Sequence, residues 1–472
     1  MPLSAPVNAV AVERAAGPFG RAAVACMQGI RNNFEDAHLL DPSGGYFGVF
    51  DGHLGDEAAA FCAERLHLHT GPASSVTASS LVLAFEACDG ELRKALAEMD
   101  DGSEAGSTAT LVAARPAKTE GKFSILVGNC GDSRAILVKS YSGTGEIQST
   151  HDHRPSDARE RERIEAAGGF VSEEFDPPRV DGQLACSRAL GAFKFKQDSS
   201  RNASEQKVSC TPEVFEWEAA AGDLLVVACD GVWDVFSSER VVEELTKHDY
   251  KSDPGAAAAK VLQLCLEKEA DDNLTLMLLC LGPPPPSAME EAKVEVTAGN
   301  FLKTKDKEVL SEYESFCRRF GYQLTKEMKP KAPPVASLAP TNPVPGPRFS
   351  KLPVPTPAST PASASVPQAG MDVKTNSDAA ILRIKVTAQK SARFYQASVQ
   401  KLLGDADPVP ATLEILGLGA AILNTAAVAT ALTQANFAIE KVETTMVSLV
   451  PRGAAERTVE VPRLLVQLRR TS

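Results

Sequence analysis

The stretch GVFDGH at residues 48–53 carries an apolar strand directly into an acidic turn. Similar apolar runs, bounded by Gly, Asp or Asn, predict buried strands at residues 47–50, 124–127, 224–227 and 276–279. Between them, residues 58–67, 79–98 and 157–167 have helical composition. Because these strands and helices come in blocks rather than in strict alternation, they favour an α+β fold with layered sheets.

Acidic residues flank the expected strands at five separate places. They are Glu35 with Asp36, Asp51, Asp132, Asp230 and Asp272. Clustered carboxylates repel one another unless a cation neutralises them, and oxygen ligands favour Mg²⁺ or Mn²⁺ over Zn²⁺. Two such ions about 3.5–4 Å apart can activate a shared water and hold both ends of a phosphoryl transfer. A single Asp or Gly after a strand is an ordinary turn residue, but five acidic sites together favour metal chemistry.

Composition predicts a globular intracellular protein with two differently charged parts. The net charge of the 472 residues is −12, whereas the part from Ala379 onward has 11 Lys and Arg against 7 Asp and Glu, or +4. The ten cysteines have no paired spacing, so we expect free buried thiols rather than zinc or disulfide frameworks. No apolar run of about 18 residues occurs, and we therefore expect no membrane partner and a cytoplasmic or nuclear location.

Eight segments, taken in order, carry a resemblance to a known family. They are residues 27–38 (MQGIRNNFEDAH), 49–53 (VFDGH), 106–109 (GSTA), 128–135 (GNCGDSRA), 152–155 (DHRP), 184–191 (LACSRALG), 228–234 (ACDGVWD) and 271–275 (DDNLT). Together they resemble the ordered motifs of type 2C metal-dependent Ser/Thr protein phosphatases, the PPM family, across residues 21–282. The resemblance implies a β-sandwich of two antiparallel sheets flanked by helices, with metals in a cleft at one edge.

The resemblance also implies which residues hold two Mg²⁺ or Mn²⁺ ions. Asp51 is expected to bridge both metals. Asp230 and Asp272 would complete the first metal site. Glu35 and the carbonyl of Gly52 would hold the second.

Catalytic roles follow from the same resemblance. Asp36 would anchor metal-bound water, and a water activated by the two metals would attack phosphorus in line. Arg31 matches the family's phosphate-binding arginine, whose fork suits two phosphate oxygens. His53 matches the general acid that protonates the departing Ser or Thr oxygen. No cysteine is needed as a nucleophile.

Further positions match secondary roles in the family. Asp132 and Asp234, together with Asp230, correspond to a weaker third metal site. Thr108 and Asn273 correspond to supporting residues.

Three positions depart from the family pattern. Leu54 stands where Gly is usual, Ala192 where Asp is usual, and Arg154 where Lys is common. None is an expected metal ligand, so they bear on substrate preference, flap behaviour and rate. His67 and His69 match no motif, and we expect them at the surface.

The rest of the chain divides by composition. We predict an N-terminal extension at 1–20, the phosphatase domain at 21–282, and a linker region at 283–378. Within the linker region, residues 303–320 form one amphipathic helix and the Pro-rich residues 329–370 form an extended tether. A polyproline ligand for an SH3-like partner is the alternative role of the Pro-rich part.

Residues 379–472 regain periodicity in the order βαβαββ. This order and the segments 384–386, 395–397 and 416–422 resemble the small Alba domains, which bind RNA or DNA and dimerise. Candidate nucleic-acid contacts are Lys385, Lys390, Arg393 and Lys401. The alternative is a dimerisation or docking module with ordinary surface lysines.

Three functions are therefore compared. The first is an active phosphatase that hydrolyses phosphoserine and phosphothreonine in phosphoprotein substrates and carries a nucleic-acid-binding or docking appendage. The second is a catalytically weak pseudophosphatase scaffold, which should lack metal ligands, whereas Asp51, Asp230 and Asp272 are all present. The third is an RNA-binding regulator, which should have a strongly basic C-terminal part, whereas the charge there is only +4. We favour the active phosphatase.

Overall fold

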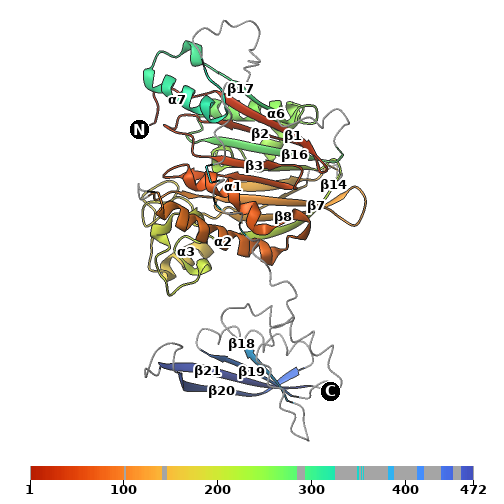
Figure 1. Ribbon diagram of the computed structural model, residues 1–472, viewed down its shortest axis with the longest axis vertical. Helices are drawn as coiled ribbons and strands as arrows, with labels where there is room; N and C mark the ends of the chain where they lie inside the picture. Colours follow the sequence, from red (N-terminus) through yellow and green to blue (C-terminus); the bar gives the residue numbers. More distant parts are fainter. Residues whose placement is uncertain are drawn as a thin grey trace. The chain divides into compact units, whose positions relative to one another are not determined.

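The computed structural model describes most of the first part of the chain and the strands of the last part. The described residues are 2–99, 103–140, 146–283, 293–324, 348–349, 352, 355, 381–386, 412–418, 437–449 and 459–470. The chain divides into two units, Met1–Thr360 and Pro361–Ser472 (Figure 1).

The first unit contains a seven-stranded antiparallel sheet. Its strand order is β10 (Ile147–Ser149), β9 (Arg134–Val138), β15 (Leu224–Ala228), β16 (Leu274–Leu281), β2 (Gly20–Met27), β1 (Val10–Gly17) and β17 (Lys293–Thr297). The two central strands β15 and β16 are almost wholly apolar and buried. Such composition is expected of strands that are covered on both faces.

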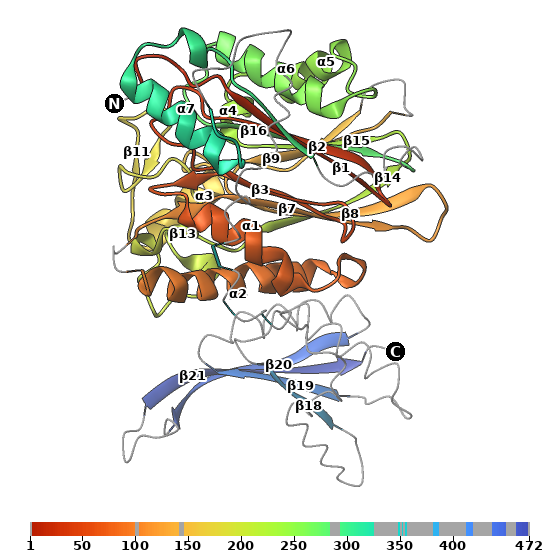
Figure 2. The ribbon, with the colours of Figure 1, turned by 45° about the horizontal axis from the view of Figure 1, so that its top comes forward.

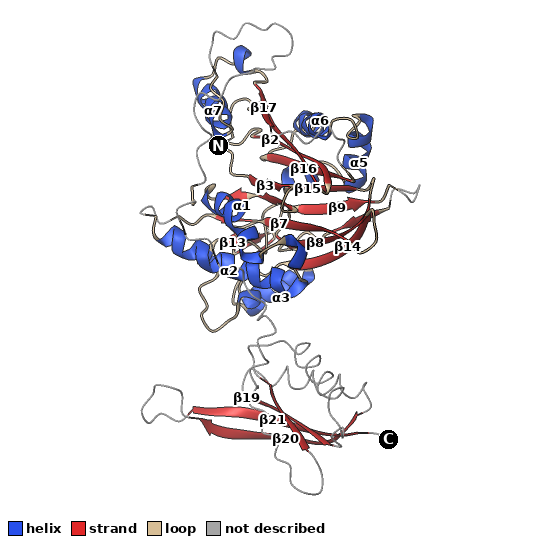
Figure 3. Ribbon diagram, turned by 45° about the vertical axis from the view of Figure 1, so that its right-hand side comes forward, coloured by secondary structure: helices blue, strands red, loops and turns tan. Residues whose placement is uncertain are grey.

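A five-stranded antiparallel sheet packs against the first. Its order is β14 (Glu213–Ala220), β8 (Lys122–Cys130), β7 (Ala109–Pro116), β4 (Tyr46–Phe50) and β3 (Ala37–Asp41). Val24 and Met277 from the larger sheet share one core cluster with Val49, Val112 and Val127 from the smaller sheet. The two inner faces therefore form the core of a β-sandwich (Figure 3).

Helices cover the outer faces of the sandwich. α1 (Glu57–Thr70) and α2 (Ala78–Ala97) pack on the five-stranded sheet, while α5 (Ser238–Lys247) and α6 (Pro254–Glu267) lie over the seven-stranded sheet (Figure 2). α1 packs through apolar side chains that include Phe61 and Leu66, and α6 packs through apolar side chains that include Val261 and Leu262. Among the described residues, none of the helices has the length and apolarity to cross a bilayer.

Short elements complete the first unit at the edge of the sandwich. β5 (Gly52–His53), β6 (Gly106–Ser107) and β13 (Leu190–Gly191) form a small sheet, and β11 (Val171–Ser172) pairs with β12 (Arg179–Val180). α3 (Ala158–Ala166) precedes β11 along the chain, and α4 (Asp230–Trp233) follows β15. The remaining short elements are the 3-10 turns η1 (Ala73–Ser75), η2 (Phe193–Phe195), η3 (Ala203–Glu205) and η5 (Phe301–Lys303).

The sandwich extends beyond the expected limits of 21 and 282. β1 pairs with β2 on one side and with β17 on the other, so residues 10–17 and 293–297 belong to the larger sheet. α7 (Lys307–Arg319), which we predicted as an amphipathic helix, buries Tyr313 and Phe316 in the sandwich core. The tether expectation also fails in part, because Phe349 is buried against α1.

The second unit contains a four-stranded sheet. Its order is β18 (Ile381–Val386), β19 (Thr412–Leu418), β21 (Val459–Arg470) and β20 (Phe437–Leu449). β18 and β19 are parallel, and the other neighbours are antiparallel. All four strands agree with the predicted βαβαββ order, in which residues 381–387, 438–449 and 457–468 were expected as strands from alternation and 413–416 as a further strand. The two helices expected between them fall outside the described residues.

Buried side chains agree with the cysteine prediction and correct the histidine prediction. All ten cysteines are free, and only Cys280 is partly exposed. His69, expected at the surface, is buried on α1 and contacts Glu91 at 2.7 Å. His67 is half-buried. Two positions apart, they point to different sides of α1. His67 lies beside the ring of Tyr46 in β4, with centroids 5.9 Å apart, and His69 contacts α2, which a search for motifs does not detect.

Candidate active site

Both sheets deliver carboxylates to the same edge of the sandwich. From the smaller sheet, Asp51 follows β4 and Asp36 immediately precedes β3. From the larger sheet, Asp230 follows β15 as the first residue of α4, and Asp272 lies just before β16. Antiparallel pairing of each strand with its neighbours brings these separate sequence positions together.

The pKa values show how closely the carboxylates gather. Burial raises the pKa of Asp51 well above its usual range, and the charges of Asp230, Asp36, Asp272 and Asp132 raise it further. Burial and the charge of Asp230 raise the pKa of Asp272 to about 8. Burial also raises the pKa of Asp36 to about 6, although hydrogen bonds from Thr275 and Cys229 oppose the shift. Five acids thus share one field of like charge.

The donor set fits a divalent cation. Oδ1 of Asp36 and Oδ1 of Asp230 are buried and have no hydrogen-bond partner. Ligand atoms of Asp36, Asp51 and Cys229 lie within 4.8 Å of one another. Unpaired buried carboxylate oxygens are costly unless a cation or proton satisfies them.

Cys229 is a group that sequence reasoning missed. Burial raises the pKa of its thiol well above the usual range, and the charges of Asp36 and Asp51 add to the shift. At neutral pH the residue is therefore a thiol, which donates to the carbonyl of Asn273 at 3.4 Å. Its position directly before Asp230 was the available signal, but the thiol is also common in buried strands.

Glu35 and Gly52 lie against each other at the rim of this cluster. Oε1 of Glu35 accepts hydrogen bonds from the Gly55 N–H at 3.0 Å and from Asn33 at 2.8 Å. A Cβ on Gly52 would lie 2.4 Å from the carbonyl oxygen of Glu35. Only glycine permits this close approach of the two backbones.

Arg31 lies at the mouth of the site. Its Nη2 contacts Oδ2 of Asp272 at 2.6 Å, its Nε donates to the carbonyl of Asp271 at 2.7 Å, and half of its side chain is exposed. An exposed ion pair of this kind is worth at most about 1 kcal/mol. The guanidinium can therefore exchange its carboxylate partner for an incoming phosphate.

His53 has one ring nitrogen that is buried and makes no hydrogen bond. Its Nε2 is buried and unpartnered, and a Cβ on Gly106 would lie 2.3 Å from this atom. Burial and the charges of Lys196 and Lys194 lower the pKa of His53 to about 4. The imidazole is consequently neutral at neutral pH, so an acid role requires a nearby negative charge.

Thr108 and Asn273 hold the loops that carry the carboxylates. Thr108 Oγ1 accepts from the Asp51 N–H at 3.2 Å. Asn273 accepts from the Glu35 N–H at 2.8 Å and donates to the carbonyls of Gln28 at 2.8 Å and Asn33 at 3.0 Å. Thr108 therefore joins two neighbouring loops of the smaller sheet, whereas Asn273, just before β16 of the larger sheet, holds the loop that carries Glu35.

An arginine lies beside the expected third metal site. Nη2 of Arg154 contacts Oδ1 of Asp234, whose side chain is 46% exposed. Burial raises the pKa of Asp132 well above its usual range, and Asp230 adds to the shift, whereas the charge of Arg154 opposes it. The guanidinium of Arg154 thus places a positive charge near both Asp132 and Asp234.

The departures at Leu54 and Ala192 share a backbone feature. Leu54 has φ of 59° and Ala192 has φ of 48°, both in the left-handed region that favours glycine. Leu54 is 59% exposed beside the cleft, whereas Ala192 is buried. Leu54 is therefore free to contact a substrate, and Ala192 is not.

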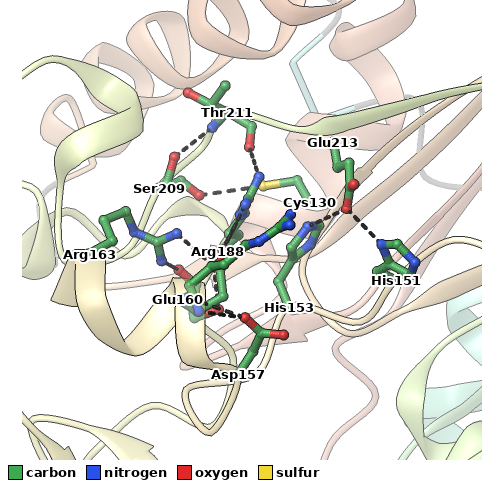
Figure 4. Close-up of polar contacts among 12 residues, drawn as sticks. Cys130, His151, His153, Asp157, Glu160, Arg163, Arg188, Ser209, Thr211 and Glu213 are labelled. Atoms are coloured by element: carbon green, nitrogen blue, oxygen red, sulfur yellow. Dashed lines mark hydrogen bonds and ion pairs between the residues drawn. The ribbon is translucent and has the colours of Figure 1, made fainter.

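An ionic network surrounds the buried Glu160 on α3 (Figure 4). Glu160 on α3 accepts from Arg188 Nη2 at 2.7 Å, Arg163 Nη1 at 2.6 Å and Ser187 Oγ at 2.7 Å. Burial alone would raise the pKa of Glu160, but its arginine partners lower the value to about 2. The network joins α3 to Ser187 and Arg188. The motif at 184–191 was recognised in the sequence, but its buried partner Glu160 was not.

Comparisons with known proteins agree with the fold. The family described as Protein phosphatase 2C matches residues 21–274. Human protein phosphatase 1B is 32% identical over 323 residues, which cover 63% of this chain and 64% of the relative. Mouse protein phosphatase 1A is 31% identical over 343 residues, which cover 68% and 86%. A crystal structure of a phosphatase from Toxoplasma gondii matches with a TM-score of 0.54 and 28% identity, covering 61% of this chain and 99% of that one.

Proposed function

The chain belongs to the protein phosphatase 2C family and is a metal-dependent protein serine/threonine phosphatase, and we propose that two Mg²⁺ or Mn²⁺ ions at its carboxylate cluster activate water for hydrolysis of phosphoserine and phosphothreonine. The observation that carries the proposal is the buried cluster around Asp51, in which several like charges meet and one oxygen each of Asp36 and Asp230 is buried without a hydrogen-bond partner. Its natural substrates are phosphoproteins.

The proposed ligands follow the positions described above. Asp51 would contact both ions, with Asp230 and Asp272 at one and Glu35 and the Gly52 carbonyl at the other. When bound, the ions would lower the pKa of water and neutralise charge on the phosphoryl group.

Asp36 would orient the attacking water, because one of its oxygens is buried without a partner while the other is fixed by Thr275 at 2.7 Å. A weaker third ion would lie near Asp132, Asp230 and Asp234. Arg154 already supplies positive charge there, so we propose that this third site is the weakest of the three.

Arg31 and His53 would act on the substrate directly. Arg31 would leave Asp272 and bind two phosphoryl oxygens through its fork. The dianionic phosphate would raise the pKa of His53 from its low value of about 4, so that its imidazole can carry a proton to the leaving Ser or Thr oxygen. The thiol of Cys229 stays protonated and forms no phosphoenzyme.

The test is hydrolysis of a phosphothreonine peptide by the full chain. Activity should require Mn²⁺ or Mg²⁺ and disappear in EDTA. Asp51→Asn should abolish it, whereas Asp249→Asn should not, because Asp249 lies in an exposed left-handed turn that asparagine also adopts. Activity that survives exhaustive EDTA treatment would contradict the mechanism. A folded, metal-binding chain without turnover would instead support the pseudophosphatase scaffold.

For residues 361–472 we propose nucleic-acid binding or self-association, with a cytoplasmic or nuclear location for the whole chain. The mildly basic charge and the order of the four strands, β18-β19-β21-β20, support this proposal. Lys385 lies in β18, whereas Lys390, Arg393 and Lys401 fall outside the described residues.

The full chain and a chain that ends at residue 360 should separate these roles. If phosphate contacts dominate, RNA retention by the full chain should weaken as salt rises and vanish in the shorter chain. Light scattering should give the mass of both chains. A full chain that is monomeric and ignores RNA at low salt would leave protein docking as the role of the C-terminal unit.

A further inference from the structure

A short segment of the Pro-rich linker is seated on α1. Phe349 is 9% exposed, and its ring lies edge-on to Phe61 of α1 with centroids 4.9 Å apart. Leu352 is half-buried against the same cluster, and its N–H donates to the carbonyl of Phe349 at 3.0 Å. Phe349 and Leu352 therefore place two apolar side chains against the helix.

The backbone of the segment is recognised by one carboxylate. Glu64 on α1 accepts from the Arg348 N–H at 2.8 Å through one oxygen and from the Phe349 N–H at 2.9 Å through the other. Such charge-assisted hydrogen bonds are stronger than those between neutral groups. The contact thus depends on the local conformation of the segment as well as on its side chains.

Arg348 makes a two-pronged contact with Asp56 at the start of α1. The distances are 2.7 Å from Nη1 to Oδ1 and 2.8 Å from Nη2 to Oδ2. Asp56 stands at the N-cap position but makes no side-chain cap hydrogen bond. Its carboxylate instead takes Arg348 and Arg319, the latter at 2.7 Å.

The contact at Asp56 reaches the proposed metal ligands. The preceding residue, Gly55, donates its N–H to Glu35 at 3.0 Å. Arg319 donates to the carbonyls of Phe34 at 2.7 Å and Asp36 at 2.8 Å, the residues on either side of Glu35. A pocket lined by Glu35, Asp56, Arg319 and Arg348, among other residues, joins these groups.

We propose that α1 carries a docking site for the chain's own segment 348–352, and that Arg348 is a positioning residue for the loop that supports Glu35. The site recognises an Arg-Phe-X-X-Leu sequence through Asp56, Phe61 and Glu64. The link to Glu35 rests on the proposed function, whereas docking itself does not. A tethered segment has an effective concentration on the order of mM, so the site is occupied within one chain even if the isolated segment binds weakly.

A labelled peptide of residues 343–355 tests the docking site on the full chain. By fluorescence anisotropy it should bind the Arg348→Ala/Phe349→Ala chain, which has released its own segment. Its affinity for the unaltered chain should be lower by about 10-fold or by a larger factor, because the chain's own segment fills that site. A peptide with Arg348→Ala should also lose about 10-fold, as expected for a charged hydrogen bond. Equal binding to both chains, or binding to neither, would overturn the docking site.

Hydrogen exchange tests the same proposal without relying on the double variant. In the unaltered full chain, the Phe349 amide should be protected by Glu64, and free exchange there would overturn docking. Arg348→Ala should speed exchange at the Gly55 amide, with partial recovery in Arg348→Lys, which restores charge but not the fork. Arg240→Ala is the matched control, since Arg240 forms an exposed pair with Glu243 on α5.

Unchanged exchange at Gly55 in Arg348→Ala would refute the positioning role even if the peptide binds. A failure of the unaltered chain to hydrolyse phosphopeptide would count against the proposed function alone, since neither anisotropy nor exchange depends on turnover.

Discussion

Neutralising Asp272 should stabilise the protein in the absence of divalent cations. In the chelated chain this carboxyl has a pKa of about 8, against an ordinary value of 3.8. For a carboxyl with a raised pKa, the stabilising protonated form is fully present below about pH 4 and is lost as the pH rises through 8. Stability of the chelated protein should therefore fall steadily between these two values.

The size of the effect follows from the shift. At about 1.4 kcal/mol per pKa unit, ionising Asp272 at pH 8 costs the folded state up to about 5 kcal/mol. Asp272→Asn removes that cost but also removes the ion pair with Arg31, which offsets up to about 1 kcal/mol. Allowing for proton sharing among neighbouring acids, we expect a gain on the order of 3 kcal/mol in the free energy of unfolding at pH 8.

The assay is thermal and denaturant unfolding in EDTA from pH 5 to pH 8, repeated in Mn²⁺. Asp271→Asn is the matched control, because Asp271 is the adjacent but exposed aspartate. Mn²⁺ should stabilise the unaltered chain and the control by mass action, and Asp272→Asn much less. If Asp272→Asn destabilises the chelated chain at pH 8, or if Mn²⁺ stabilises it fully, the charge-cluster reasoning is wrong.

Further substitutions test other parts of the site. Asp230→Ala should lower kcat on a phosphothreonine peptide by on the order of 100-fold or more, as for loss of a group that stabilises the transition state, whereas Leu54→Gly should cost far less because Leu54 only lines the cleft; equal losses would contradict the site assignment. Lys194→Ala should raise the pKa of His53, measured by NMR titration in the chelated chain, because one of the charges that lower it is removed; an unchanged value would show that the charge of Lys194 does not act on His53. Glu160→Gln should destabilise the fold by about 3 kcal/mol, the low end for breaking a buried pair, by leaving two half-buried arginines without their carboxylate. Since the pKa of Glu160 is about 2, its contribution is present above about pH 4.5 and lost as the pH falls towards 2, so acid unfolding should be less steep in that variant than in the unaltered chain.

The sequence by itself predicted four buried strands of the sandwich, the helices α1, α2 and α3, and the residues of the acidic cluster. Apolar runs such as 224–227 predict strands because a buried strand must be apolar on both faces. Alternation likewise predicted three of the four described strands of the C-terminal unit, β18, β20 and β21. Asp51 and Asp230 were identifiable because each directly follows such a run, where a carboxylate is held rigidly by the strand end.

Only the tertiary structure decided how distant segments support that cluster. β1 joins the larger sheet between its neighbour along the chain, β2, and the distant strand β17, and pairing such as Val10 with Thr297 leaves no local signal. Likewise, Glu160 resembles any acid on an exposed helix until Arg188 is placed beside it. Phe349 lies in a Pro-rich stretch that cannot bury enough apolar surface of its own, and it becomes ordered because α1 supplies Phe61 and Glu64 as a ready surface.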